Sequence, residues 1–296
     1  MSIIDTLRFI TEHPLNQHRK FRALGRFLKW QIGSRLVPGQ VIFDWVNGAK
    51  IIVSRGETGL TGNIYCGLHE FADMAYILHV LTPEDLFIDV GANVGSYTIL
   101  ACAAKGAKAY CFEPISSTFA RLMNNIRLND LTERVKAMNI GISDEEAEMT
   151  FTVANNCANH AVLRTDIGAL TTSARVLPLD RVIPNESPSV IKIDVEGFEG
   201  PVLKGASSVL RKESLHSVII ELNGSGKRYG FNEESIIRTM IEHGFSAYRY
   251  NPFDREILRL AGKNDQSGNT LFIRNERIVR EKIAKSQKYF VAEVYI

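Results

Sequence analysis

The fold is decided by a stretch of twelve residues at positions 87–98, which reads FIDVGANVGSYT. Together with Leu86, its first part is a short apolar run rich in β-forming residues, and such a run predicts a buried strand. Gly91 and Gly95 then bracket a tight turn, and the small and apolar residues over 97–104 predict a helix. A strand, a glycine-rich turn and a helix N-terminus together leave backbone N–H groups open to a ligand. We therefore expect the ligand site of the protein at this turn.

The composition is typical of a globular protein with one sizeable core, since the 296 residues are 45% hydrophobic and 23% charged. The net charge of +2 gives no overall field that would attract nucleic acid, so we expect no nucleic-acid partner. No apolar run approaches the roughly 20 residues that cross a bilayer. The first residues lack the apolar region and cleavage site of a signal peptide, which favours a cytoplasmic location.

The four cysteines show neither a CxxC pair nor the density of a disulfide-stabilised scaffold. They are Cys66, Cys102, Cys111 and Cys157. Cys102 and Cys111 fall within predicted core elements, so we expect both to be buried free thiols.

From residue 86 onward, strand patterns alternate with helix patterns, which argues for a mostly parallel sheet with helices on both faces. Seven core strands are predicted, at 86–90, 108–112, 135–142, 190–195, 217–222, 245–250 and 269–274. Helices are predicted at 97–104, 116–129 (with Ser116 or Ser117 as N-cap), 202–212, 233–243 and 277–288. Two extra strands, 148–153 and 175–177, flank a polar segment at 155–173 that suits a substrate loop. The prediction is a Rossmann-like α/β domain over 83–275, followed by a C-terminal helix and tail at 276–296.

Residues 1–82 are predicted to form a helical and β-hairpin cap ahead of this domain. Asn47-Gly48 stands between the apolar runs 41–46 and 50–54, which is a strong signal for a hairpin with a type I′ turn. The glycine-rich residues 55–62 predict a loop.

The first 37 residues predict helices, and no acidic residue occurs between Glu12 and Asp44. Over residues 19–30, arginines and lysines interleave with large apolar side chains. A basic amphipathic helix of this kind suits the surface of an anionic membrane or a partner protein. The alternative, which we favour here, is a helix whose apolar stripe packs on its own domain while its charges are solvated.

The glycine-rich turn does not fit the dinucleotide pattern G-x-G-x-x-G, because Asn93 and Ser96 occupy its second and third glycine positions. It resembles the pattern D-x-G-x-[GN]-x-G of class I S-adenosylmethionine-dependent methyltransferases, through Asp89, Gly91, Asn93 and Gly95. A sulfonium cofactor has no pyrophosphate, so its loop needs fewer N–H groups and a carboxylate near the cationic end.

Two other strand ends complete the expected cofactor site. Glu113 ends the second strand, where a carboxylate can accept hydrogen bonds from both hydroxyls of a ribose. Ile142 and Ser143 follow at the exit of the third strand, in a position suited to an adenine ring. Together with the turn, these residues predict S-adenosylmethionine as the cofactor.

Three stretches of the chain resemble the FkbM family of methyltransferases. They are FIDVGANVGSYT at 87–98 followed by FEP at 112–114, VIKIDVEGFE at 190–199, and VIIELN at 218–223. The resemblance covers roughly residues 65–275, and the IDVEG element is its most specific part. It implies a class I Rossmann-like fold and transfer of a methyl group, mostly to oxygen, on a small-molecule natural product, sugar or glycan. The resemblance does not fix the acceptor.

The chemistry is expected where the fourth and fifth core strands end. Lys192, Asp194 and Glu196 share one face if the fourth strand continues that far. In one hypothesis, Asp194 or Glu196 is a general base or orients the acceptor. In the other, Asp194, Glu221 and Asn223 are oxygen ligands of a Mg²⁺ ion that lowers the pKa of the acceptor hydroxyl.

Two alternatives to an active methyltransferase stay open. One is an NAD(P)-dependent oxidoreductase on the same sheet, against which Asn93 and Ser96 count. The other is a catalytically silent, methyltransferase-like binding module, although the acidic residues that such a module would lose are present. A local structural role also stays open for Glu196 and Glu199, because both precede a helix whose N-terminus favours negative charge.

Overall fold

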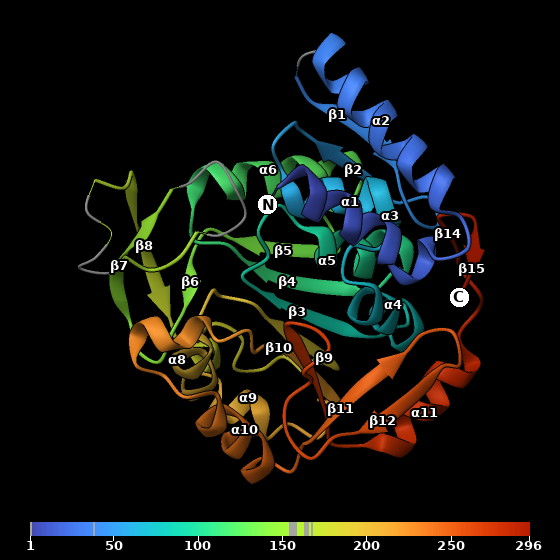
Figure 1. Ribbon diagram of the computed structural model, residues 1–296. Helices are drawn as coiled ribbons and strands as arrows, with labels where there is room; N and C mark the ends of the chain where they lie inside the picture. The colour runs from blue at the N-terminus through green and yellow to red at the C-terminus, as the bar shows by residue number, and fades with distance from the viewer. Residues whose placement is uncertain (1, 38, 154–158, 163–165, 167) are drawn as a thin grey trace.

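A β-sheet of eight strands runs through the centre of the molecule (Figure 1). The computed structural model describes residues 2–37, 39–153, 159–162, 166 and 168–296. In spatial order the strands are β12 (Glu256–Arg259), β11 (Ser246–Asn251), β13 (Asn269–Ile273), β10 (Ser217–Glu221), β9 (Val190–Ile193), β3 (Leu86–Val90), β4 (Lys108–Phe112) and β5 (Val135–Met138). Seven of them are the predicted core strands, and β12 is an additional edge strand.

The sheet is mostly parallel and contains a switch point. Strands β5, β4, β3, β9 and β10 are parallel neighbours. Strand β13 is antiparallel to both β10 and β11, so β11 runs in the same direction as β10. From β3 the chain builds the sheet outward through β4 and β5, and then returns to the other side of β3 with β9. Ligands of open α/β sheets bind at the carboxyl ends of the strands, beside this reversal.

Alternate residues of the central strands enter two separate cores. Phe87 belongs to the core on one face and Ile88 to the core on the other. Helices α4 (Phe71–Val80), α5 (Ser96–Ile99), α6 (Ser116–Leu128) and α11 (Glu276–Lys285), with the π-helical turn η2 (Leu100–Ala104), contribute to the first core. Helices α7 (Leu179–Val182), α8 (Glu199–Lys204), α9 (Ser207–Leu210) and α10 (Glu233–Glu242) contribute to the second. The prediction of a mostly parallel α/β sheet with helices on both faces is confirmed.

The N-terminal residues form helices and a hairpin that pack on the first core. The elements are α1 (Ile3–Glu12), η1 (Pro14–Asn16), α2 (Lys20–Leu36), β1 (Val41–Asp44), β2 (Lys50–Val53) and α3 (Thr58–Cys66). The hairpin is confirmed, with Asn47 and Gly48 both at positive φ, as a type I′ turn requires. The loop predicted over 55–62 is wrong, because α3 begins inside it. The limits at residues 82 and 276 stay predictions.

A second, smaller sheet stands beside β5 and consists of β6 (Gly141–Ile142), β8 (Thr171–Leu177) and β7 (Ala147–Thr152). The single strand predicted over 135–142 is therefore wrong. It breaks at Asn139, whose side-chain amide donates to the carbonyls of Glu113 and Pro114. The predicted polar segment at 155–173 lies partly outside the described residues.

Two predicted helix boundaries also differ from the structure. The helix expected over 202–212 is two helices, α8 and α9, because the Asp180 carboxylate accepts the N–H groups of Ser208 and Val209 and so begins a new helix. Neither serine caps α6, since its N-cap is Ile115 and the Ser116 hydroxyl donates to Asn139 Oδ1 instead.

The remaining elements complete the C-terminal part and the surface. They are η3 (Ser225–Tyr229), β14 (Phe290–Val291) and β15 (Val294–Tyr295). Cys102 and Cys111 are buried free thiols, as predicted, and Cys157 lies outside the described residues. Within the described part of the chain, no helix combines the length and apolarity that a membrane crossing requires.

Candidate functional site

A cleft opens at the carboxyl ends of β3, β4, β9 and β10, at the switch point of the sheet. Most residues predicted from the sequence line it, namely Asp89, Gly91, Asn93, Glu113, Ile142, Lys192, Asp194, Glu196 and Glu221. Gly95, Ser143 and Asn223 are absent from its lining among the described residues. The structure therefore brings the expected cofactor residues and the expected catalytic residues into one cleft.

The glycine turn is pressed against the chain that leaves β9. Gly91 has φ +80°, and a Cβ atom at this position would lie 1.8 Å from the backbone oxygen of Asp194. The N–H groups of Gly91 and Ala92 both donate to the carbonyl of Phe112, at 3.1 and 2.9 Å. Only glycine tolerates this conformation and this approach together. The turn thus fixes the position of Asp194 relative to β3.

The three predicted residues outside the cleft lining have local roles. Gly95 has φ +96° and begins α5, and a Cβ there would lie 2.6 Å from a methyl group of Leu122. The Ser143 N–H donates to the carbonyl of Leu177. Asn223 Oδ1 accepts the N–H of Ser225 at 2.8 Å.

Glu113 holds the glycine turn with its carboxylate. One oxygen accepts the N–H of Asn93 at 3.0 Å and the other accepts the N–H of Ile115 at 3.0 Å. Asn93 is itself left-handed, with φ 52°. Burial raises the pKa of Glu113 to about 7, while the two backbone N–H groups oppose this rise. Each oxygen has further acceptor capacity for hydroxyl groups in the cleft.

Asp89 is buried beneath the turn, at the end of β3. Its carboxylate accepts the hydroxyl of Thr98 at 2.6 Å, which connects the strand to the helical segment after the turn. Burial raises the pKa of Asp89 to about 6, and the nearby charge of Lys192 lowers it in part. Asp89 therefore has a structural partner in addition to its place in the cleft.

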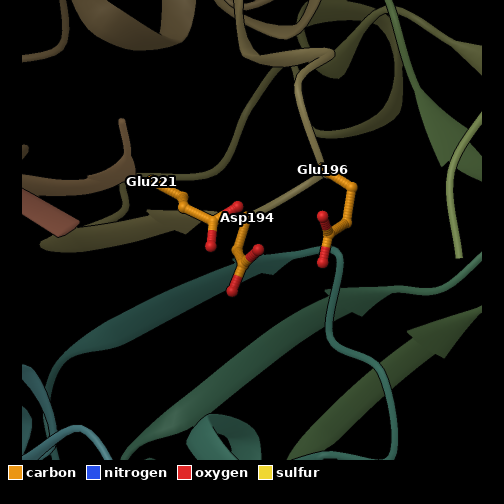
Figure 2. Close-up of side chains that lie close together, drawn as sticks. All are labelled: Asp194, Glu196 and Glu221. Carbon is orange, nitrogen blue, oxygen red and sulfur yellow. The ribbon is translucent and has the colours of Figure 1, made fainter. Parts of the chain in front are cut away.

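Three carboxylates converge in the same cleft, at the carboxyl ends of β9 and β10. Asp194, Glu196 and Glu221 have oxygen atoms within 4.8 Å of one another. Figure 2 shows Glu221 and Asp194 on adjacent segments and Glu196 reaching back toward them from the loop beyond. Glu196 adopts a left-handed conformation with φ 55°, and β9 ends at Ile193, so the strand does not continue as far as Glu196. The turn, rather than strand alternation, brings Glu196 to this cluster.

Lys192 is the buried counter-charge of this cluster. Its Nζ lies 2.6 Å from Asp194 Oδ2 and 4.5 Å from the ring centroid of Tyr97. Burial alone would lower the pKa of Lys192, but the charges of Asp194, Glu70 and Asp89 raise it above its ordinary value. The lysine is therefore a permanent cation that orients Asp194.

Three glutamates near this wall have raised pKa values, and burial is the largest cause in each case: Glu196, Glu199 and Glu221. Burial, then Asp194 and Glu196, raise the pKa of Glu221 far above its ordinary value. Burial also raises the pKa of Glu199 to about 7, although its carboxylate accepts the N–H groups of Gly197 and Val195. The Glu199 carboxylate thus stabilises the loop that precedes α8. Glu221 favours its protonated form.

Sequence reasoning missed a set of residues that the cap contributes. The Tyr97 hydroxyl donates to Glu70 at 2.8 Å. The amide of Asn269 donates to both Glu70 and Asp73, at 3.0 and 3.1 Å. Burial raises the pKa of Asp73 to about 7. Tyr97 stands within the stretch at 87–98, but no pattern in the sequence predicts that it meets Glu70, or that Asn269 meets Glu70 and Asp73. His160, which also lines the cleft, belongs to the polar segment predicted at 155–173.

The close approach at Gly91 gives a first prediction. Gly91→Ala should destabilise the protein by about 2 kcal/mol more than Gly230→Ala, because a Cβ at Gly91 must displace the Asp194 backbone. Gly230 is a matched control, with φ +77° and open space around it, so it carries only the conformational cost of roughly 1–2 kcal/mol. Urea unfolding followed by circular dichroism measures both. Equal losses would contradict the steric role of Gly91.

The buried Glu113 gives a second prediction. The side chain ionises near pH 4.5 when unfolded and about 7 when folded, so its contribution to stability falls as the pH rises between these values. Glu113→Gln removes that dependence, and the melting temperature of the variant should rise relative to wild type from pH 4.5 to 7. Glu234→Gln, at an exposed position on α10, is the control and should show a constant difference. A constant difference for Glu113→Gln as well would refute the assignment.

Known proteins resemble parts of this chain. Residues 89–247, more than half of the chain, match the family described as the methyltransferase FkbM domain. The hexuronic acid methyltransferase AglP of Haloferax volcanii is 30% identical over 150 residues, which cover 50% of this chain and 59% of that protein. The methyltransferase sdnD of Sordaria araneosa is 25% identical over 185 residues, covering 51% of this chain and 71% of the other.

A solved structure also resembles the chain. The methyltransferase FkbM from Methylobacillus flagellatus aligns with a TM-score of 0.45 at 18% identity, covering 72% of this chain and 52% of that one. This chain thus spans less than two-thirds of the length of AglP and of the Methylobacillus protein. The match to the family over residues 89–247 includes the glycine turn, Glu113 and the three converging carboxylates. The chain belongs to the FkbM family of methyltransferases.

Proposed function

We propose that the protein is an S-adenosylmethionine-dependent O-methyltransferase that acts on a hydroxyl group of a sugar, glycan or natural product. One observation carries the proposal: the glycine turn with Glu113 and the carboxylates at Asp194, Glu196 and Glu221 line the same cleft. The first set suits a nucleoside with free ribose hydroxyls, and the second suits an acceptor that must lose a proton. The bound cofactor would supply an activated methyl group.

The cofactor would be held by the residues at the ends of β3 and β4. Glu113 keeps acceptor capacity after its two backbone hydrogen bonds, so it can receive both ribose hydroxyls. The backbone at Gly91 has no side chain to obstruct a ligand. Ile142 offers an apolar surface for a purine ring, since it lines the cleft beside the turn.

The acceptor hydroxyl would be deprotonated at the carboxylates at the ends of β9 and β10. Asp194 is the candidate base, because its side chain is partly exposed and the ion pair with Lys192 keeps the carboxylate oriented. Glu221, which favours its protonated form, can donate a hydrogen bond to the acceptor while Asp194 accepts the proton. Glu196 completes the wall, and Lys192 acts through Asp194 as a positioning residue.

A divalent cation is the alternative use of the same carboxylates. Magnesium prefers carboxylate oxygens, and Asp194, Glu196 and Glu221 are close enough to share one ion. Asn223, which the sequence suggested as a ligand, has its side-chain oxygen committed to Ser225. A cation here would lower the pKa of the acceptor hydroxyl and keep Glu221 ionised.

A sugar acid is a reasonable acceptor to try first. The relative AglP is named a hexuronic acid methyltransferase, and its match covers half of this chain. Hydroxyl groups of a sugar ring would meet the carboxylates of the cleft as hydrogen-bond donors.

Calorimetric titration tests the cofactor. S-adenosylhomocysteine should bind with a Kd in the micromolar range, on the order of −8 kcal/mol, and NADH should not bind. Glu113→Gln should weaken binding at least about tenfold, because an amide replaces an oxygen acceptor with a donor. Binding of NADH alone would overturn the proposal and favour an oxidoreductase.

Substitution of Asp194 tests the base. With a methyl-labelled cofactor and a panel of sugars, glycolipids and hydroxylated metabolites, Asp194→Asn should lower turnover by about 10²-fold or more and leave S-adenosylhomocysteine binding nearly unchanged. Asp144→Asn is a matched control, since both aspartates have side chains 26% exposed and a lysine Nζ at 2.6 Å. Weakened cofactor binding without a loss in turnover would refute the assignment.

The same assay separates the base from the cation. If Asp194 acts as the base without a metal, exhaustive chelation with EDTA leaves turnover unchanged. If the carboxylates hold an ion, chelation abolishes turnover and added Mg²⁺ restores it.

A further inference from the structure

Helix α2 has two apolar faces, and only one of them packs on the protein. Ala23 and Phe27 are buried, and the Phe27 ring lies 5.3 Å from that of Tyr65 in α3. The Arg26 guanidinium on this side donates to the Tyr65 carbonyl and to Asn16 Oδ1. The apolar stripe that packs on its own domain, expected from the sequence, is therefore this inner face.

A second apolar stripe lies on the outer face of α2. Its side chains are exposed by 91% at Phe21, 55% at Leu28, 58% at Ile32 and 76% at Leu36. The spacings of seven, four and four residues keep all four on one side of a helix. We call these four residues the outer stripe. Figure 1 shows α2 at the edge of the molecule, with no other element of the described chain on its outer side.

Cations flank the outer stripe on both sides. Arg22 and Lys29 lie on one side of the stripe and Arg35 on the other, and all three are exposed. The nearest acidic partner is Glu293, which pairs with Arg22 at 2.5 Å and with Arg19 at 3.2 Å. The helix itself contains no acidic residue, so the stripe lies in a positive field.

An exposed apolar stripe between rows of cations matches one kind of surface best. An anionic bilayer offers an apolar interior just below a negatively charged face, and a helix of this pattern lies in that interface. Two copies of α2 would bring their positive rows together, which disfavours self-association through this face. Nucleic acid would meet the cations but would leave the large apolar side chains in water.

We propose that the outer stripe of α2 is a docking surface for anionic phospholipid membranes. The stripe inserts its four apolar side chains, and Lys29 and Arg35 meet the lipid phosphates. Helix α2 packs on α3, and α3 supplies Gly59 and Leu60 to the lining of the cleft. Docking through α2 would therefore leave only α3 between the docked helix and the cleft. This inference is independent of the methyl acceptor, because binding to vesicles requires no turnover.

Flotation with vesicles tests the proposal on the full chain. The protein should float with vesicles that contain about 30 mol% phosphatidylglycerol at least tenfold more strongly than with pure phosphatidylcholine. This binding should weaken as the salt concentration rises from about 0.05 to 0.5 M, because the charges lie at the surface.

Two variants separate the apolar contribution from the charges. Leu28→Ser with Ile32→Ser should lower binding to anionic vesicles about tenfold, since it removes apolar area that would enter the interface. Ile241→Ser is a matched control on α10, because Ile241 is 59% exposed and Ile32 is 58% exposed. Lys29→Glu with Arg35→Glu should abolish the preference for anionic lipid. Unchanged circular dichroism verifies the fold of each variant.

Three outcomes would overturn the proposal. The first is no binding to either vesicle, and the second is binding that the double serine variant leaves intact. The third is a dimer in light scattering that dissociates when the outer stripe is changed, which would assign the face to a second copy of the chain. Calorimetry with S-adenosylhomocysteine runs in parallel, so a failure of the cofactor assignment is distinguished from a failure of docking.

Discussion

The site depends on the close approach between the turn after β3 and the chain that leaves β9. A glycine at position 91 lets the Asp194 carbonyl lie where any side chain would be. Without this contact, the wall that suits a nucleoside and the wall that suits an acceptor would separate. Glu113 secures the turn from the other side through the N–H of Asn93. Two loops from distant parts of the sequence are thereby held as one rigid unit.

A second constraint is the balance of charge beneath the cleft. Several carboxylates are buried or half-buried there. Lys192 is buried among them and stays positively charged, because the neighbouring acids raise its pKa. Burial raises the pKa of Glu221 most, and the charges of Asp194 and Glu196 raise it further, because each carboxylate that ionises makes the next ionisation harder. Glu221 consequently favours its protonated form, directly beside Asp194, the base that we propose. A carboxyl group with a strongly raised pKa in a cleft, here Glu221, is common at sites of acid–base chemistry.

Features that depend on local pattern could be predicted from the sequence, and features that depend on tertiary contact could not. The turn at Gly91, Glu113 and the acid at Asp194 follow from strand ends and glycine spacing. The approach of Glu196 depends on a left-handed residue, and no pattern in the sequence predicts that conformation. Helix α3 was missed because its glycines suggest a loop, although contacts with α2 hold it helical. The two faces of α2 likewise become distinct only once α3 occupies one of them.

The reversed strand β13 has a consequence for the edge where the cleft opens. In a purely parallel sheet, only the C-terminal residues of the strands would lie at this edge. Because β13 runs the other way, its first residue, Asn269, lies opposite Glu221 and extends an amide toward Glu70 and Asp73. The antiparallel direction of β13 thus places the neutral amide of Asn269 as a hydrogen-bond donor among several acidic side chains. It also ties the C-terminal part of the sheet to the α4 helix near the N-terminus.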